Sequence, residues 1–400
     1  MPRPPSLPHP VVHLATDELH RGPWVYARQV GPPRGAAAPD GAIVEVRDAS
    51  DRFLGHALHN GASDIRLRWL ARGRRHDLDR PREFLLARLR AADRLRRAVL
   101  RLEETTDAYR VAHAEGDDLP GLVIDRLAGV LVCEHHSRGF HALRAEIAAA
   151  LGELYPGLPV VHRVPPGARR TEGFDPPAEE DGAPPEVLIT EHGLRFPVLP
   201  GREHKTGWFC DQRDNRRRIG ALGRGRVVLD LCCNAGGFAL QAARAGARRV
   251  TAVDLDEKVL ARAAAAAAQN GLAVEFVHAD AFDVLRDLRR EPLARRPELV
   301  VLDPPKIAAG RRDLEAARAK YGDLNSLTLE ALRPGGLLAS FSCSGALDLA
   351  GFLGLVFGAA RRAGREVKLL EVLGAGPDHP QRPDWPRSRY LKGALLAADA

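Results

Sequence analysis

The sequence predicts an α/β protein, with a doubly wound, mostly parallel seven-stranded sheet following a small β-barrel and a small α+β domain. The first observation is a strand–turn–helix–strand unit over residues 226–256, after which apolar runs and helical stretches alternate to the C-terminus. The second is a set of short β-rich runs between residues 20 and 70, separated by turn residues. We expect three domains, at residues 1–75, 76–190 and 191–400.

The N-terminal domain is predicted from four short runs rich in aromatic and β-branched residues. They lie at residues 22–26, 42–46, 53–57 and 65–70. Trp24 could stack on a nucleic-acid base, but a tryptophan in a small barrel more often fills the core, and we expect the core role.

The middle domain begins with a helix over residues 80–103, whose leucines share one face. Strands over 109–134 and a helix over 140–154 follow. Residues 172–186 hold six acids, four prolines and no basic residue, which predicts a solvated loop.

A basic segment joins the first two domains. Between Arg66 and Arg101 there are 13 arginines and four acids. This local excess of +9 is larger than the net charge of +7 of the whole chain. Such a segment suits a phosphate backbone, and Arg72, Arg74 and Arg75 are candidate contacts. The alternative is an ordinary solvated helix face.

The 226–256 unit predicts a nucleotide-like ligand. A buried strand at 227–229 ends at Asp230, a turn with Asn234 and Gly236 leads into a helix, and a strand at 250–253 ends at Asp254. An acid at the second strand end is placed to bind ribose hydroxyls. The third glycine of a dinucleotide fingerprint is absent, and Asp230 would repel a pyrophosphate. These features favour S-adenosylmethionine, which carries a sulfonium and an ammonium group; the alternative is a structural unit without a ligand.

Further polar residues follow the later strands, predicted at 274–278, 299–302, 337–342, 367–372 and 390–396. Asp280 and Asp303 come after the third and fourth strands, and Cys343 follows the fifth. Methylation of a pyrimidine ring carbon requires a nucleophile at the adjacent ring position, which a cysteine supplies. The alternative for Cys343 is a small buried filler residue. Lys306 could add positive charge if the fourth and fifth strands are neighbours.

Composition excludes several classes of protein. No apolar run approaches the ~20 residues of a membrane span, and the start of the chain lacks the apolar stretch of a signal peptide. Five cysteines without a Cys-x-x-Cys pair indicate a reduced, cytoplasmic setting and no zinc site.

Several motifs resemble the RlmI-type large-subunit ribosomal RNA cytosine-5 methyltransferases over nearly the whole length. They include Gly-Asp-Asp-Leu-Pro-Gly at 116–121, Lys-Thr-Gly-Trp-Phe at 205–209, Leu-Asp-Pro-Pro-Lys at 302–306, Ser-Cys-Ser at 342–344 and Arg-Tyr-Leu-Lys-Gly at 389–393. The resemblance implies an N-terminal PUA-like RNA-binding barrel, a class I methyltransferase domain and S-adenosylmethionine as cofactor. It implies 5-methylcytosine formation in 23S-type ribosomal RNA, at an unpaired or flipped cytosine. Whether the protein forms a homodimer is left open.

The resemblance also assigns site residues. Cys343 is the expected nucleophile, and Asp303 is expected to bind the cytosine edge. The expected cofactor-binding residues are Asp230, Asn234, Gly236, Asp254, Asp280 and Gln212, and the expected RNA-binding residues are Arg72, Arg74, Arg75 and Lys306. Gln212 belongs to a polar run that alone would read as a surface helix. Lys306 stands where many relatives carry a second cysteine, so the base that removes the ring proton stays unassigned.

Two other functions are compatible with these motifs. An enzyme that methylates an exocyclic amino group would need Asp303 but no cysteine. A non-catalytic RNA-binding protein that kept the fold would need neither, although the intact Asp230 and Asp254 argue against it.

Overall fold

The computed structural model describes residues 9–17, 22–73, 76, 78–176, 185–202, 205–306 and 314–399. The chain forms two compact units. The first consists of Met1–Val187, Val198–Phe209 and Pro377–Ser388, and the second of Leu188–Pro197, Cys210–Gly376 and Arg389–Ala400. Each unit therefore contains segments that are distant in the sequence.

The first unit begins with the predicted PUA-like barrel, which has five strands, one more than the four predicted runs. They are β1 (Val11–His13), β2 (Trp24–Tyr26), β3 (Ile43–Arg47), β4 (Phe53–His59) and β5 (Ile65–Arg72). Their order is β1-β3-β4-β5-β2, and only the β1–β3 pair is parallel. A bridge between Leu14 and Val30 brings the two outer edges of this sheet together. A short 3-10 turn (η1, Ala27–Gln29) precedes Val30.

The expectation that Trp24 fills the barrel core was wrong. The core instead holds Trp69 with Val25, Val44 and Leu67. Trp24 is half-buried, its indole N–H donates to Glu115 (2.9 Å), and its ring meets that of Trp385 edge-on. Alternation along β2 explains the difference, because buried Val25 turns its neighbours to the other face.

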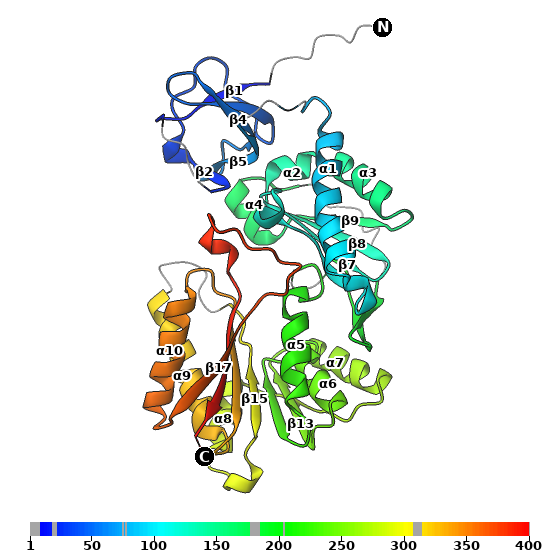
Figure 1. Ribbon diagram of the computed structural model, residues 1–400, viewed down its shortest axis with the longest axis vertical. Helices are drawn as coiled ribbons and strands as arrows, with labels where there is room; N and C mark the ends of the chain where they lie inside the picture. The colour runs from blue at the N-terminus through cyan, green and yellow to red at the C-terminus, as the bar shows by residue number, and fades with distance from the viewer. Residues whose placement is uncertain are drawn as a thin grey trace. The chain divides into compact units, whose positions relative to one another are not determined.

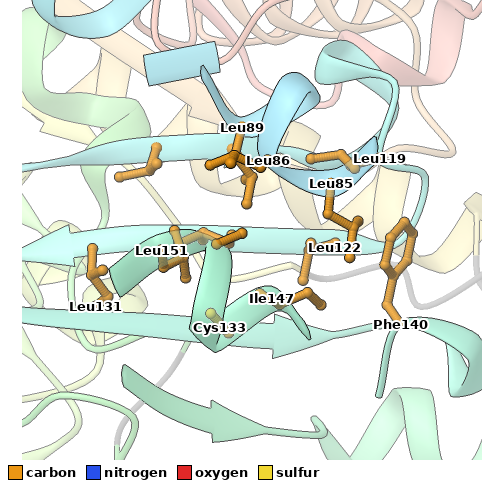
Figure 2. Packing of buried hydrophobic residues seen from close by; sticks show 14 of the residues in the cluster. Leu85, Leu86, Leu89, Leu119, Leu122, Leu131, Cys133, Phe140, Ile147 and Leu151 are labelled. Atoms are coloured by element: carbon orange, nitrogen blue, oxygen red, sulfur yellow. The ribbon is translucent and has the colours of Figure 1, made fainter. Parts of the chain in front are cut away.

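The middle part of the first unit packs helices on a four-stranded sheet of order β6-β7-β8-β9. The strands are β6 (Ala108–His113), β7 (Leu122–Leu127), β8 (Val130–His135) and β9 (Val160–Arg163). The helices are α1 (Pro81–Arg94), α2 (Arg138–Ala142), α3 (Arg144–Leu154) and α4 (Pro166–Glu172). Leucines of α1 and apolar residues of α3 meet side chains of β7 and β8 in one core (Figure 2). The predicted 80–103 helix is regular only to Arg94, after which a π-turn (η2, Leu95–Val99) and a 3-10 turn (η3, Leu102–Glu104) follow.

Glu172, predicted to begin a solvated loop, is buried at the end of α4. Its carboxylate accepts hydrogen bonds from Arg68 (2.8 Å) and Ser63 (3.0 Å). A buried guanidinium needs an anionic partner, and this one lies more than a hundred residues away in the sequence. Residues 177–184 of the predicted loop lie outside the described residues.

The second unit contains the predicted seven-stranded sheet. Its strands are β12 (Val227–Leu231), β13 (Arg249–Asp254), β14 (Glu275–His278), β15 (Leu299–Leu302), β16 (Leu337–Ser342), β17 (Val367–Gly374) and β18 (Lys392–Ala398). Their order is β14-β13-β12-β15-β16-β18-β17. All are parallel except β18, which runs antiparallel to β16 and β17. The strand order reverses between β12 and β15, which is the usual ligand position in such sheets.

Two layers of helices cover this sheet (Figure 1). One layer holds α5 (Arg213–Ala221), α6 (Gly237–Arg244) and α7 (Glu257–Gln269), and the other holds α8 (Ala281–Leu288), α9 (Leu314–Ala331) and α10 (Leu349–Arg362). A separate hairpin, β10 (Val187–Glu191) and β11 (Leu194–Val198), precedes α5. In the described part of the chain, every helix is too short or too polar to cross a bilayer.

Candidate active site at the carboxyl edge of the sheet

The predicted catalytic residues follow two strands that are neighbours in the sheet. Leu231 of β12 pairs with Leu302 of β15, and Leu302 pairs with Ser340 of β16. Asp303 therefore follows directly after one strand, and Cys343 directly after its neighbour. The fourth and fifth predicted strands are therefore neighbours, which is what a supply of positive charge by Lys306 requires.

Asp230 is fully buried beside this edge. One carboxylate oxygen accepts the backbone N–H of Ala239 (3.0 Å), and the other has no hydrogen-bond partner among the described residues. Burial raises the pKa of Asp230 well above its ordinary value, and the nearby carboxylates of Asp303 and Asp254 add to that shift. Asp230 lies inside β12, with Leu231 after it, rather than at the strand end as predicted.

The turn after β12 is tied to the end of β13. The backbone at Asn234 (φ 48°) and at Gly236 (φ 74°) is left-handed, and α6 begins at the next residue. The Asn234 N–H donates to the Asp254 carboxylate (2.9 Å), which also accepts from the Asp256 N–H (3.0 Å). A carboxylate offers about four lone-pair positions, so Asp254 keeps capacity for two hydroxyl donors.

The edge carries a concentrated negative field. Burial raises the pKa of Cys232 to about 12, and four acids contribute to the shift: Asp254, Asp303, Asp230 and Asp280. The pKa of Cys233 is raised as well, chiefly by burial and then by Asp230. Both of these thiols therefore stay protonated at neutral pH. A buried carboxylate with an unpartnered oxygen among further acids fits a cationic ligand such as S-adenosylmethionine.

The predicted surface helix over the polar run is α5, and it is largely buried. Arg213, Asn215 and Arg216 all face the protein interior. Arg216 forms a two-point ion pair with Glu191 of β10, at 2.7 and 2.5 Å. A Cβ added to Gly237, the first residue of α6, would lie 2.3 Å from the Arg216 side chain. The hairpin and α5 thus brace the start of α6, beside the turn at residues 234–236 that is predicted to bind the cofactor (the cofactor turn).

Gln212, predicted as a cofactor contact, is hydrogen-bonded to Asp303. Its amide N–H donates to the Asp303 carboxylate (2.8 Å), and its carbonyl accepts from Asn215 (2.6 Å). Asn215 also donates to the Gly374 carbonyl (2.9 Å). This chain of amides holds the Asp303 carboxylate in one orientation.

Cys343 lies half-buried between two buried serines, at the margin of a core that includes Phe341 and Leu391. Lys306 is exposed. The cation that lies buried near Cys343 is Lys392 of β18. Sequence reasoning gave Lys392 no role, although it belongs to the 389–393 motif.

The predicted RNA contacts are only partly described. Arg72 is half-buried, stacks over the Trp69 ring and donates to the Gly22 carbonyl, while Arg74 and Arg75 lie outside the described residues. Many other arginines of the basic segment pair with acids elsewhere in the first unit. These pairs include Arg68–Glu172, Arg82–Glu153, Arg88–Asp118 and Arg96–Asp117. The local excess of +9 inferred from the sequence therefore overstates the free positive charge.

Comparisons with known proteins show the family of this chain. Residues 179–393 match the S-adenosylmethionine-dependent methyltransferase family, and residues 17–72 match a PUA-like domain. The chain is 35% identical to ribosomal RNA large subunit methyltransferase I of Aeromonas hydrophila over 390 residues, which covers 95% of this chain and 96% of that protein. It is also 35% identical to the protein of the same name from Photobacterium profundum, covering 93% and 94%.

Solved structures share the fold. A Streptococcus mutans protein described as a SAM-dependent methyltransferase superposes with a TM-score of 0.78 at 21% identity, covering 97% of this chain and all of that one. A methyltransferase structure in complex with SAH gives the same TM-score of 0.78 at 20% identity, covering 98% and 100%. These findings confirm the cofactor class and the fold predicted from the sequence. The chain belongs to the ribosomal RNA large subunit methyltransferase I family of S-adenosylmethionine-dependent methyltransferases.

Proposed function

We propose that this methyltransferase forms 5-methylcytosine in large-subunit ribosomal RNA, with Cys343 as nucleophile. The observation that carries the proposal is that β15 and β16 are paired neighbours, with Asp303 directly after the carboxyl end of one and Cys343 directly after that of the other. The names of the relatives support the RNA substrate, because they are called ribosomal RNA large subunit methyltransferases. With such an RNA substrate, we expect the enzyme to act in the cytoplasm.

The chemistry requires a cysteine because the C5 carbon of cytosine is a poor nucleophile. Addition of the Cys343 thiolate to C6 places the electron pair of the C5–C6 double bond on C5, which can then take a methyl group. Asp303 binds the amino group and ring nitrogen of the base and stabilises the positive charge there. Gln212 and Asn215 hold the Asp303 carboxylate in place for that contact.

The cofactor-binding residues act through charge and hydrogen bonding. Asp254 and Asp280 would bind the nucleoside part, and Asp230 with the 234–236 turn would hold the cationic amino-acid part. When bound there, S-adenosylmethionine supplies an electrophilic methyl group.

The first unit would hold the RNA. Its PUA-like barrel and those arginines that lack acidic partners would contact phosphates, and the target cytosine must be unpaired or flipped to reach a buried edge. Lys306, exposed after the Asp-Pro-Pro turn, would contact the phosphates next to that base.

The proposal is tested with large-subunit ribosomal RNA made by transcription in vitro, which carries no natural methyl groups and contains 5-fluorocytidine in place of cytidine. Fluorine at C5 cannot leave as a proton, so the parent enzyme should form a covalent RNA–protein adduct that survives denaturing electrophoresis. Cys343→Ser should form no adduct and lose at least ~1,000-fold in methyl transfer, while cofactor and RNA affinities stay within a factor of about two.

Cys133→Ala is the matched control, because Cys133 is a buried cysteine in the core of the first unit, whereas Cys343 belongs to the second unit. It should keep both activity and adduct formation. A Cys343→Ser enzyme that still methylates, with no adduct in the parent, would contradict the proposal and favour transfer to an exocyclic amino group.

A further inference from the structure

Lys392 is a buried lysine beside the end of β16. It is the first residue of β18 and pairs in register with Ser342, the last residue of β16. Its side chain is 3% exposed, whereas Lys306 on the same edge is exposed. Burial of a lysine is costly unless its nitrogen has polar partners, so its presence here needs a reason.

The Lys392 nitrogen is held by two backbone carbonyls. It donates to the Ser344 carbonyl (2.6 Å) and to the Tyr390 carbonyl (2.7 Å). Cys343 directly precedes Ser344, so one of these bonds fixes the nitrogen to the segment that carries the thiol. A tetrahedral nitrogen with two such bonds has one further N–H as an ammonium, or a lone pair in that direction as a neutral amine.

The pKa of Lys392 lies close to physiological pH. Burial lowers its pKa to about 8, while the negative charges of Cys343 and Asp348 act in the opposite direction. A neutral amine is therefore accessible at physiological pH, and an adjacent thiolate would favour the ammonium form. Negative charge on Cys343 therefore favours protonation of Lys392, as transfer of a proton from sulfur to nitrogen requires.

We propose that Lys392 accepts the thiol proton of Cys343 and then holds the thiolate as an ammonium partner. This inference rests on the nucleophilic role proposed for Cys343. The proton passes from sulfur to the Lys392 nitrogen, whose lone pair forms the new N–H bond. The electron pair left on sulfur forms the bond to C6 of the base as the C5–C6 π pair moves to C5. At the end of the cycle a base removes the C5 proton, and the C5–H pair re-forms the C5–C6 double bond. The C6–S pair returns to sulfur, which the ammonium again stabilises.

Alkylation of Cys343 by iodoacetamide tests this role without RNA or cofactor. Lys392→Gln is the informative variant, because its amide keeps two N–H donors on a side chain only one bond shorter but carries neither charge nor basic nitrogen. In the parent, the pH at which Cys343 alkylation is half-maximal should lie below that of a free cysteine, at ~8.5. At pH 7, Lys392→Gln should slow alkylation of the Cys343 peptide, followed by mass spectrometry, about tenfold.

Methyl transfer should show the same dependence. Lys392→Gln should lower kcat at pH 7 about a hundredfold and recover about tenfold per pH unit toward pH 9, since solution hydroxide can then form the thiolate. Lys368→Gln is the control, because Lys368 is an exposed lysine of the neighbouring strand β17, and it should change neither measurement.

Two results from the alkylation and pH measurements would overturn the assignment. One is a parent half-maximal pH at or above that of a free cysteine, which needs no variant to fold. The other is a Lys392→Gln enzyme with parental alkylation rate and pH profile. The 5-fluorocytidine adduct separates the two proposals. Its absence from the parent refutes the covalent mechanism, whereas adduct formation at the parental rate by Lys392→Gln refutes only the role of Lys392.

Discussion

Replacing Gly237 with alanine tests whether the buried pair of Arg216 and Glu191 braces the cofactor turn. The new Cβ would lie 2.3 Å from Cδ and 3.0 Å from Nε of Arg216. A flexible side chain would move aside at little cost, but Arg216 is 4% exposed and bonded to Glu191 at two points. The clash can therefore be relieved only by breaking that pair or by shifting the start of α6.

The magnitude follows from these two routes. Breaking a buried ion pair costs about 3–5 kcal/mol, and alanine in place of glycine in a helix returns roughly 0.5–1 kcal/mol. We expect Gly237→Ala to lower the free energy of unfolding of the second unit by about 2–4 kcal/mol. For a unit of this size, that lowers the melting temperature by roughly 5–15 °C. S-adenosylmethionine affinity should fall too, because the turn adjoins the displaced residue.

Differential scanning calorimetry and a calorimetric cofactor titration measure both effects. Gly354→Ala is the matched control, since Gly354 is also a helical glycine, in α10, and its added Cβ would meet nothing within 4 Å. That variant should be stabilised by roughly 0.5–1 kcal/mol. In a Glu191→Ala/Arg216→Ala background, Gly237→Ala should cost less than about 1 kcal/mol. A Gly237→Ala protein that melts with the parent would show that the Arg216 side chain yields freely.

Three further predictions concern the cofactor, the RNA and pH. Asp254→Ala should weaken S-adenosylmethionine binding by about 1.5–3 kcal/mol for each hydroxyl hydrogen bond removed and leave RNA affinity intact; unchanged calorimetric affinity would remove the cofactor assignment. Neutralising Arg72 together with exposed Arg94 should reduce the slope of log RNA affinity against log salt by about 0.7–0.9 for each phosphate that is no longer neutralised, and an unaltered slope would mean that neither residue binds phosphate. Burial lowers the pKa of His162 to about 4, below its ordinary 6.5. The stability that depends on neutral His162 is therefore fully present above pH 6.5 and is lost as pH falls toward 4. Urea denaturation should show that the first unit is up to about 3 kcal/mol less stable at pH 4 than at pH 7.5. His162→Asn should reduce that difference, and an equal pH dependence in both proteins would contradict the reasoning.

Local sequence pattern determined the scaffold of the site. The predicted strands at 299–302 and 337–342 coincide with β15 and β16, because strands buried on both faces appear as short continuous apolar runs. The same pattern placed Asp254, Asp303 and Cys343 after strand ends, and the carboxyl ends of parallel strands meet at one edge. Motif resemblance supplied the family, the cofactor and the PUA-like barrel.

The tertiary structure alone decided which polar residues pair. Glu172 and Arg68, like Glu191 and Arg216, are partners separated by many residues, and their burial depends on each other. The sequence predicted a solvated loop and a surface helix at these places, since charged residues are rarely buried without a partner. The hydrogen bond from Gln212 to Asp303 was likewise not predicted from the sequence.

Lys392 shows the same limit at the reactive edge. It lies 49 residues after Cys343 in the sequence, and the antiparallel pairing of β18 with β16 brings it beside the end of that strand. Hydrophobic periodicity reports which face of a strand is buried but carries no information about which strand lies next to it. The neighbour of Cys343, and with it the source of positive charge, is therefore a property of the sheet order rather than of any local pattern.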